Sequence, residues 1–169
     1  MAVSSETMLR SFSASLEIDC PAEEAFRLLC AVEKWPVWLS FLRSARLADA
    51  KLPVRLGSEV IVRSSLPGDE EQLYEVDGFI ANYHLSLVGA YSVRRRLDFR
   101  VERKTSTAKI HARLTYPAYH GRLGVLLDRW RRGRKISTAL SDALVHFKGL
   151  VEHRKDDPVL ALAVVDPDC

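Results

Sequence analysis

An arginine on the apolar side of a strand is the first candidate for chemistry in this sequence of 169 residues. Apolar and charged residues alternate from position 93 to 103, and Arg95 falls in phase with Leu97 and Phe99 rather than with the other charges. Because a buried guanidinium needs a partner, Arg95 predicts an internal carboxylate or an anionic ligand. A place at the strand end, where the side chain reaches water, would explain the same pattern.

Two carboxylates, Glu75 and Asp77, are the candidates for that pairing. They share a strand face with Phe79, while Tyr74 lies on the other face. Periodicity alone does not decide which face points inward. If Glu75 and Asp77 point inward, one of them would form an acid–base pair with Arg95, and the pKa of its carboxyl would be perturbed.

The other candidates are side chains that suit the wall of an apolar pocket. Aromatic rings offer broad apolar contact with a polar edge, and a tyrosine hydroxyl or an imidazole can orient a carbonyl or phenol. These residues are Trp35, Trp38, Tyr74, His84, Phe99, Tyr116 and Trp130. Core packing explains the tryptophans equally well, and we expect it for at least one of Trp35 and Trp38.

Motifs for metal, nucleophile or nucleotide chemistry are absent. The five histidines form no ligand set. The sequence also has no His-Glu-x-x-His, no Gly-x-Ser-x-Gly, no phosphate-binding glycine loop and no Cys-x-x-Cys. We therefore expect no cofactor and no metal ion, and the sequence assigns no catalytic residue.

The charge pattern disfavours nucleic acid as a partner. The net charge of +3 is small, and no series of aromatic residues suited to base stacking accompanies the basic clusters at 94–96 and 129–135. Peripheral contact of these clusters with an anionic membrane remains an alternative. No run reaches the roughly 20 apolar residues of a membrane span, and residues 1–10 hold no apolar signal core. We therefore expect a cytoplasmic protein.

The elements that position these residues begin with a half-buried strand over residues 11–19. Pro21 then suits the first turn of a helix, and Trp35 opens a second short helical segment. Alternating segments that follow predict an antiparallel sheet with one wet face and one apolar face, over residues 44–52, 57–66, 72–81, 84–90, 93–103 and 108–116.

A long amphipathic helix over residues 121–153 should cover the apolar face. Its inward stripe is formed by Leu126, Trp130, Gly133, Ser137, Leu140, Leu144, Phe147 and Val151. The small residues Gly133 and Ser137 in the middle of the stripe predict an empty volume between helix and sheet. The alternative is that Gly133 interrupts the helix and divides it in two.

Three stretches carry a resemblance to a known family: 20–26 (CPAEEAF), 33–38 (EKWPVW) and 144–152 (LVHFKGLVE). With the order of elements from 12 to 152, the chain resembles the START-like SRPBCC superfamily, in particular its polyketide cyclase/dehydrase and coenzyme-Q-binding branch. The resemblance implies an α+β helix-grip fold. In it, a curved antiparallel sheet of six or seven strands wraps around a long C-terminal helix, with two short helices after the first strand.

We expect one START-like domain over residues 11–153, with an N-terminal extension at 1–10 and a C-terminal tail at 154–169. The apolar run 159–165 in the tail should dock on the domain itself or on a second subunit. The protein would accordingly be a monomer or a homodimer.

The function implied by the resemblance is binding or transport of a hydrophobic small molecule, lipid-like or aromatic and polyketide-like, in a cavity between sheet and helix. An enzyme of the polyketide cyclase or dehydratase type, a lyase or isomerase, is the first alternative. A protein-interaction module is the second. An inward acid or histidine would favour the enzyme, whereas a wholly apolar cavity would favour the carrier.

Overall fold

The computed structural model describes residues 9–64, 71–117 and 133–153. Its strands are β1 (Leu9–Ile18), β2 (Leu42–Leu47), β3 (Glu59–Ser64), β4 (Glu71–Ile80), β5 (His84–Gly89), β6 (Ser92–Arg103) and β7 (Ala108–Pro117). Its helical segments are α1 (Ala22–Cys30), η1 (Val32–Lys34), α2 (Trp35–Trp38) and α4 (Gly133–His153). All seven strands pair antiparallel in one sheet, in the order β1-β7-β6-β5-β4-β3-β2.

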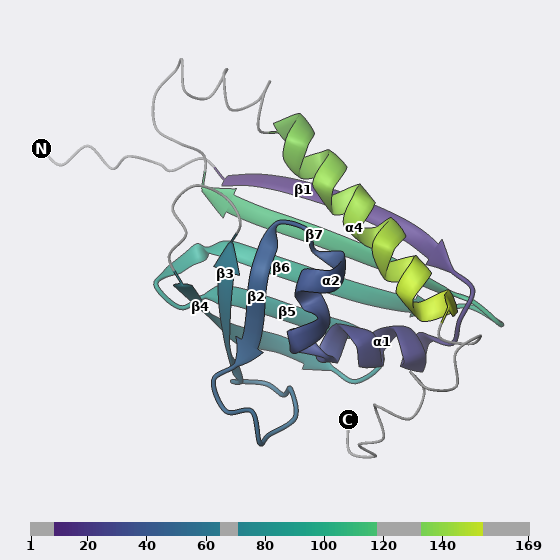
Figure 1. Cartoon of the computed structure of the whole chain (residues 1–169), viewed down its shortest axis with the longest axis horizontal. Coiled ribbons are helices and arrows are strands. Elements are labelled where there is room, and N and C mark those ends of the chain that lie inside the picture. Colours follow the sequence, from purple (N-terminus) through teal and green to yellow (C-terminus); the bar gives the residue numbers. More distant parts are fainter. Residues whose placement is uncertain (1–8, 65–70, 118–132, 154–169) are drawn as a thin grey trace, which may run out of the picture.

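The helices lie on one face of this sheet, which we call the inner face (Figure 1). α4 runs along β1, while α1 packs on β6 and β7 and α2 lies between β2 and α4. No described helix covers the opposite, outer face (Figure 1). The expected α+β architecture is confirmed, with a curved antiparallel sheet, two short helices after the first strand and a long helix near the C-terminal end.

Local sequence explains where the first helices begin. Pro21 has φ −59° and ψ 148°, extended backbone that suits the residue before a helix, and Glu23 and Glu24 occupy the first turn of α1. Carboxylates there face the positive end of the helix dipole. α2 has Pro36 in its first turn, where the missing N–H leaves no hydrogen bond unmade.

The strand meander follows the alternation expected from sequence in most places. On β6, Leu97, Phe99 and Val101 are buried. The expected turn between β4 and β5 is present, and Asn82 adopts a left-handed φ of 60°. One expected strand was too long, because β2 ends at Leu47 and the chain from 48 to 57 forms turns and loop instead.

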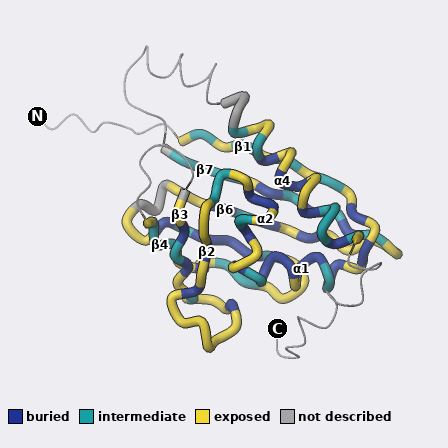
Figure 2. Tube along the Cα trace, in the orientation of Figure 1, coloured by how far each residue is buried: buried dark blue, intermediate teal, exposed yellow. Residues whose placement is uncertain are grey.

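Burial of α4 increases toward its C-terminal half (Figure 2). Ser137 is exposed, whereas the buried positions farther along are Leu140, Ala143, Leu144, Phe147 and Val151. The expected helix from 121 is described only from Gly133 onward. Residues 121–132, among them Trp130, and the apolar run 159–165 lie outside the described residues.

Candidate functional site

Four aromatic side chains fill the space between α2, α4 and β6. The ring centroid of Trp38 lies 4.9 Å from that of Phe147 and 5.7 Å from that of Phe99. Trp35 packs edge-on against Phe99 at 6.1 Å, and its indole N–H donates to the backbone carbonyl of Leu29 at 2.8 Å. All four rings are at most 1% exposed, so Trp35, Trp38 and Phe99 lie in the packed core between α2, α4 and β6.

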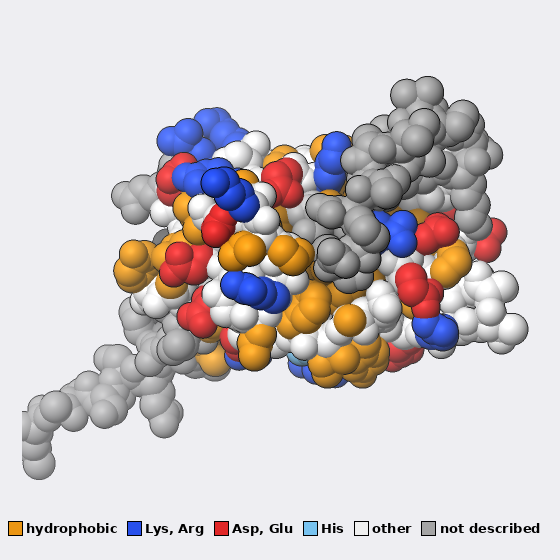
Figure 3. All heavy atoms as spheres, turned by 90° about the horizontal axis from the view of Figure 1, so that it is seen from below, with side chains coloured by type: hydrophobic (Ala, Val, Ile, Leu, Met, Phe, Trp, Pro, Cys, Tyr) orange, Lys and Arg blue, Asp and Glu red, His pale blue; other side chains and the backbone are white. Residues whose placement is uncertain are grey.

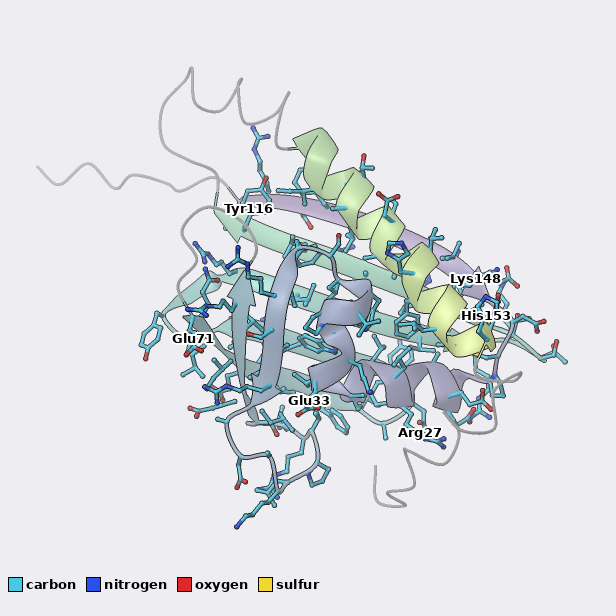
Figure 4. All side chains as sticks on the ribbon, viewed as in Figure 1. Arg27, Glu33, Glu71, Tyr116, Lys148 and His153 are labelled. Carbon is cyan, nitrogen blue, oxygen red and sulfur yellow. The ribbon has the colours of Figure 1, made fainter. Side chains whose placement is uncertain are left out.

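Hydrophobic residues that are only partly buried occur along the inner face, among them Leu16, Phe79 and Leu150, and one group of them lies at the end away from the four rings. The residues of this group come from β1, β2, β4, β7 and the residue before β2, and they are Phe12, Phe41, Leu42, Tyr74 and Leu114. The Tyr116 ring stacks on Phe12, with centroids 5.8 Å apart and planes 11° from parallel. In Figure 4, Tyr116 lies at the far end of α4 from Lys148 and His153.

Strand register brings three polar side chains into one row at this end, and we call Tyr74, Arg95 and Tyr116 the polar row. Leu97 on β6 pairs with Leu114 on β7, so Arg95 and Tyr116 each lie two positions farther along antiparallel neighbours. Tyr74 faces inward together with the buried Val76. The polar row therefore crosses the inner face beside hydrophobic residues that are only partly buried.

The phenol of Tyr74 has a perturbed pKa. Burial raises the pKa of its phenol above the ordinary value of 10.0, although Arg95, which hydrogen-bonds to the hydroxyl, acts in the opposite direction. The hydroxyl also donates to Gln72 Oε1 at 3.3 Å. A neutral phenol and a guanidinium thus stand side by side, and together they can bind a carbonyl or an anionic oxygen.

Gln72 was not among the residues expected from sequence. It lies on the same strand face as Tyr74, two residues earlier, and that spacing was the available signal.

The expected buried ion pair of Arg95 with Glu75 or Asp77 is wrong. Arg95 is exposed, as the strand-end alternative required, and Glu75 is exposed on the outer face. Asp77 instead forms an ion pair with Arg96 and accepts a hydrogen bond from Ser86 at 2.7 Å. The acids point away from the interior because Tyr74 and Val76 occupy the inward positions of β4.

Comparison with known proteins finds no matching family model and no matching curated protein. Solved structures do match. TTHA0849 from Thermus thermophilus superposes with a TM-score of 0.68 at 15% identity, covering 86% of this chain and 99% of that one. The Zhui aromatase/cyclase from a Streptomyces species gives a TM-score of 0.68 at 10% identity, covering 87% and 96%. The Aha1 dimer from Colwellia psychrerythraea gives 0.58 at 15%, covering 85% and 96%.

This chain has the helix-grip fold. The fold expected from the resemblance to the START-like SRPBCC superfamily is thereby confirmed, while the cyclase and coenzyme-Q-binding branch stays a prediction. In this helix-grip sheet the polar row lies on the inner face, and its member Tyr116 lies at the end of α4 away from Lys148 and His153 (Figure 4).

Besides the three core aromatic residues, His84 and Ser137 also do not join the polar row of the helix-grip sheet. His84 is on the outer face, where its Nε2 lies 2.9 Å from Asp98 Oδ2, so the expectation that it approaches the interior is wrong. Ser137 is exposed at the edge of the buried stripe of α4, not at its centre. Gly133 is the first described residue of α4, and the empty volume expected beside it stays a prediction.

Metal ligation and membrane insertion gain no support from the described part of this helix-grip chain. Within residues 9–64, 71–117 and 133–153, no three His, Cys, Asp or Glu side chains converge as metal ligands. None of the helices in those ranges combines the length and apolar character needed to cross a membrane.

Proposed function

We propose that the protein binds or transports a hydrophobic small molecule on the inner face, between the sheet and α4. The observation that carries this proposal is the polar row, a neutral phenol beside a guanidinium at the partly buried end of an otherwise apolar surface. A ligand that fits has an apolar body for Phe12 and Leu114. Its head carries an oxygen that accepts from Tyr74 and Arg95.

Tyr74 suits the role of a fixed donor. Because burial raises the pKa of its phenol above 10.0, the group keeps its proton near neutral pH. The hydroxyl has one proton, which it donates to Gln72 Oε1 at 3.3 Å, so a ligand oxygen accepts this proton by replacing that long hydrogen bond. Arg95 adds a positive charge at a more exposed place, where a ligand head can reach it from solvent.

A cyclase or dehydratase, a lyase or isomerase, is the second candidate. One of the superposing proteins is an aromatase/cyclase, and Tyr74 with Arg95 could stabilise an enolate oxygen. Such a reaction also needs a group that moves a proton. Of the sequence candidates for acid–base chemistry, which also include Tyr74 and Arg95, the two carboxylates Glu75 and Asp77 and the imidazole of His84 lie on the outer face, which favours binding over catalysis.

The proposal also concerns contacts of the protein surface with an anionic membrane or with a second copy of the chain. On the face seen in Figure 3, acidic and basic side chains are interspersed with hydrophobic ones, without a large area of a single charge. That mixture does not favour anionic membrane over other partners. One superposing protein is a dimer, so a homodimer is an alternative to a monomer for this chain. Light scattering of the purified protein distinguishes the two.

The test uses two fluorophores with matched variants. Anilinonaphthalene sulfonate has an aromatic body and an anionic head, whereas phenylnaphthylamine has a similar body without the charge. We expect Arg95→Gln to weaken sulfonate binding about tenfold and to leave the uncharged dye unaffected, because one charge-assisted hydrogen bond is lost. Tyr74→Phe should weaken binding of the sulfonate dye by less than Arg95→Gln does, and it should leave the uncharged dye unaffected because that dye has no oxygen to accept from Tyr74.

The control is Arg46→Gln, which removes an equal charge from the exposed Arg46–Glu71 pair on β2 and β4. Equal losses in Arg95→Gln and Arg46→Gln would contradict the site, since they would reflect only net charge. Absence of dye binding to the parent, together with no co-purified small molecule in native mass spectrometry, would contradict the proposed function itself.

A further inference from the structure

The outer face of the sheet contains a hollow of about 250 Å³ that is separate from the polar row. Its floor is the paired backbone of Ala14 on β1 and Ala112 on β7. Ser13 and Ser15 line one side, and charged residues of β6 and β7 line the other. No described helix covers this face, so the hollow is open to solvent.

Side-chain length explains why the surface is hollow here. Ser13 pairs with Arg113 and Ser15 pairs with His111 across the β1–β7 ladder. Each short serine thus stands beside a long or ring-bearing side chain, on a strand at the edge of the sheet. The long side chains form a wall, and the serines leave space next to it.

The two acids in the lining already have partners. Asp98 is 2.9 Å from His84 Nε2 and 3.4 Å from Arg100 Nε, and its side chain is only 15% exposed. Glu102 lies 3.3 Å from Nε2 of His111. The carboxylate of Asp98 is therefore engaged within the sheet surface, whereas that of Glu102 is 56% exposed to solvent.

The two guanidinium groups in the lining use only part of their donors within the described residues. Arg113 donates to Ser13 Oγ at 3.4 Å, and no ion pair joins it to a described carboxylate. Arg100 uses its Nε toward Asp98, whereas a guanidinium carries five N–H donors. The hollow thus has two guanidinium groups and two serine hydroxyls with donors to spare.

We propose that this hollow binds an oxyanion, the carboxylate or phosphate group of a small molecule, between Arg113 and Arg100. The serine hydroxyls complete the set of donors, and the fork of a guanidinium matches two oxygens of such a group. The site does not depend on the polar row, because the two lie on opposite faces of the sheet and share no residue.

Binding is measured by calorimetric titration with inorganic phosphate and with acetate, and by the NMR signals of arginine Nε–H groups. We expect saturable binding at about millimolar concentration, with a shift of the Arg113 signal. Arg113→Gln should weaken binding about tenfold, since a charged hydrogen bond is removed. Ser13→Leu should weaken it similarly, because the side chain fills the hollow of an exposed edge strand.

The control Arg46→Gln removes an equal charge on β2, at the other edge of the sheet. Retained binding in this variant supports the site. An equal loss in Arg46→Gln and Arg113→Gln, or the absence of saturable binding to the parent, overturns it.

Vesicles distinguish the two sources of a phosphate group. Sedimentation with phosphatidylglycerol vesicles that is lost in Arg113→Gln and kept in Arg46→Gln assigns a lipid headgroup. Binding of free phosphate without sedimentation assigns a soluble molecule.

Discussion

His84 donates from Nε2 to Oδ2 of Asp98 at 2.9 Å, and this bond joins β5 to β6 on the outer face of the sheet. The imidazole fits there because Gly78 on the neighbouring strand has no side chain. A Cβ at position 78 would lie 2.5 Å from Ser86 Oγ and 3.0 Å from His84 Cε1. The polar network of the outer face therefore depends on a glycine.

Gly78→Ala is expected to lower the free energy of unfolding by about 1–3 kcal/mol, because Ser86 and His84 must shift. Urea unfolding measures the change. The matched control is Gly149→Ala, where a Cβ meets nothing within 4 Å and alanine favours the helix by roughly 0.5–1 kcal/mol. A Gly78→Ala protein as stable as the parent, with His84 signals unchanged, would disprove the crowding.

Phe147→Ala is expected to cost about 3–5 kcal/mol, since the ring is fully buried against Trp38. Val145→Ala on the same helix should change stability by less than about 0.5 kcal/mol, because Val145 is 57% exposed. Thermal unfolding of both variants provides the comparison. Similar losses in the two would show that α4 does not pack by the face described.

Tyr74 should make stability depend on pH at the alkaline end. Its folded pKa is raised above the 10.0 of an ordinary tyrosine, so the folded state holds the proton more tightly than the unfolded state. This contribution is fully present below pH 10 and is lost as pH rises through the folded pKa.

Tyr74→Phe is accordingly expected to show a shallower decline of stability above pH 10 than the parent, measured by urea unfolding at several pH values. Tyr83→Phe, which changes an exposed tyrosine of the β4–β5 turn, should retain the parent's slope. Identical slopes in the parent and Tyr74→Phe would argue against burial of the phenol.

Ser137→Leu is expected to alter stability by less than about 0.5 kcal/mol, because the side chain is exposed. Uptake of an apolar fluorophore should also persist. Marked destabilisation, or loss of uptake in a folded protein, would instead place position 137 against the sheet, as its place on the helical stripe first indicated.

Many of the strands and the start of the first helix can be predicted from local sequence patterns. Alternation in β1, β6 and β7 identified the residues that share a face, and Pro21 with two acidic residues marked the start of α1. These features depend on neighbours along the chain, whose conformational preferences act at short range. The helix-grip order of elements could therefore be predicted from sequence.

The faces of β4 were decided only by tertiary structure. A bulge between Val76 and Gly78 shifts the register, so that Tyr74, Val76 and Phe79 all face inward although simple alternation separates them. Asp77, next to the inward Val76, lies on the outer face, where Arg96 and Ser86 bind it. Periodicity cannot reveal such a break, because the pairing that creates it involves a neighbouring strand.

Strand pairing produces both the polar row and the outer-face hollow. Tyr74 and Arg95 meet through pairing across three strands, and Ser13 lies beside Arg113, which is distant along the chain. The sequence by itself determined which residues are charged, aromatic or small. Only the register of the antiparallel sheet decided which of them share a surface, since pairing energy depends on the whole buried face.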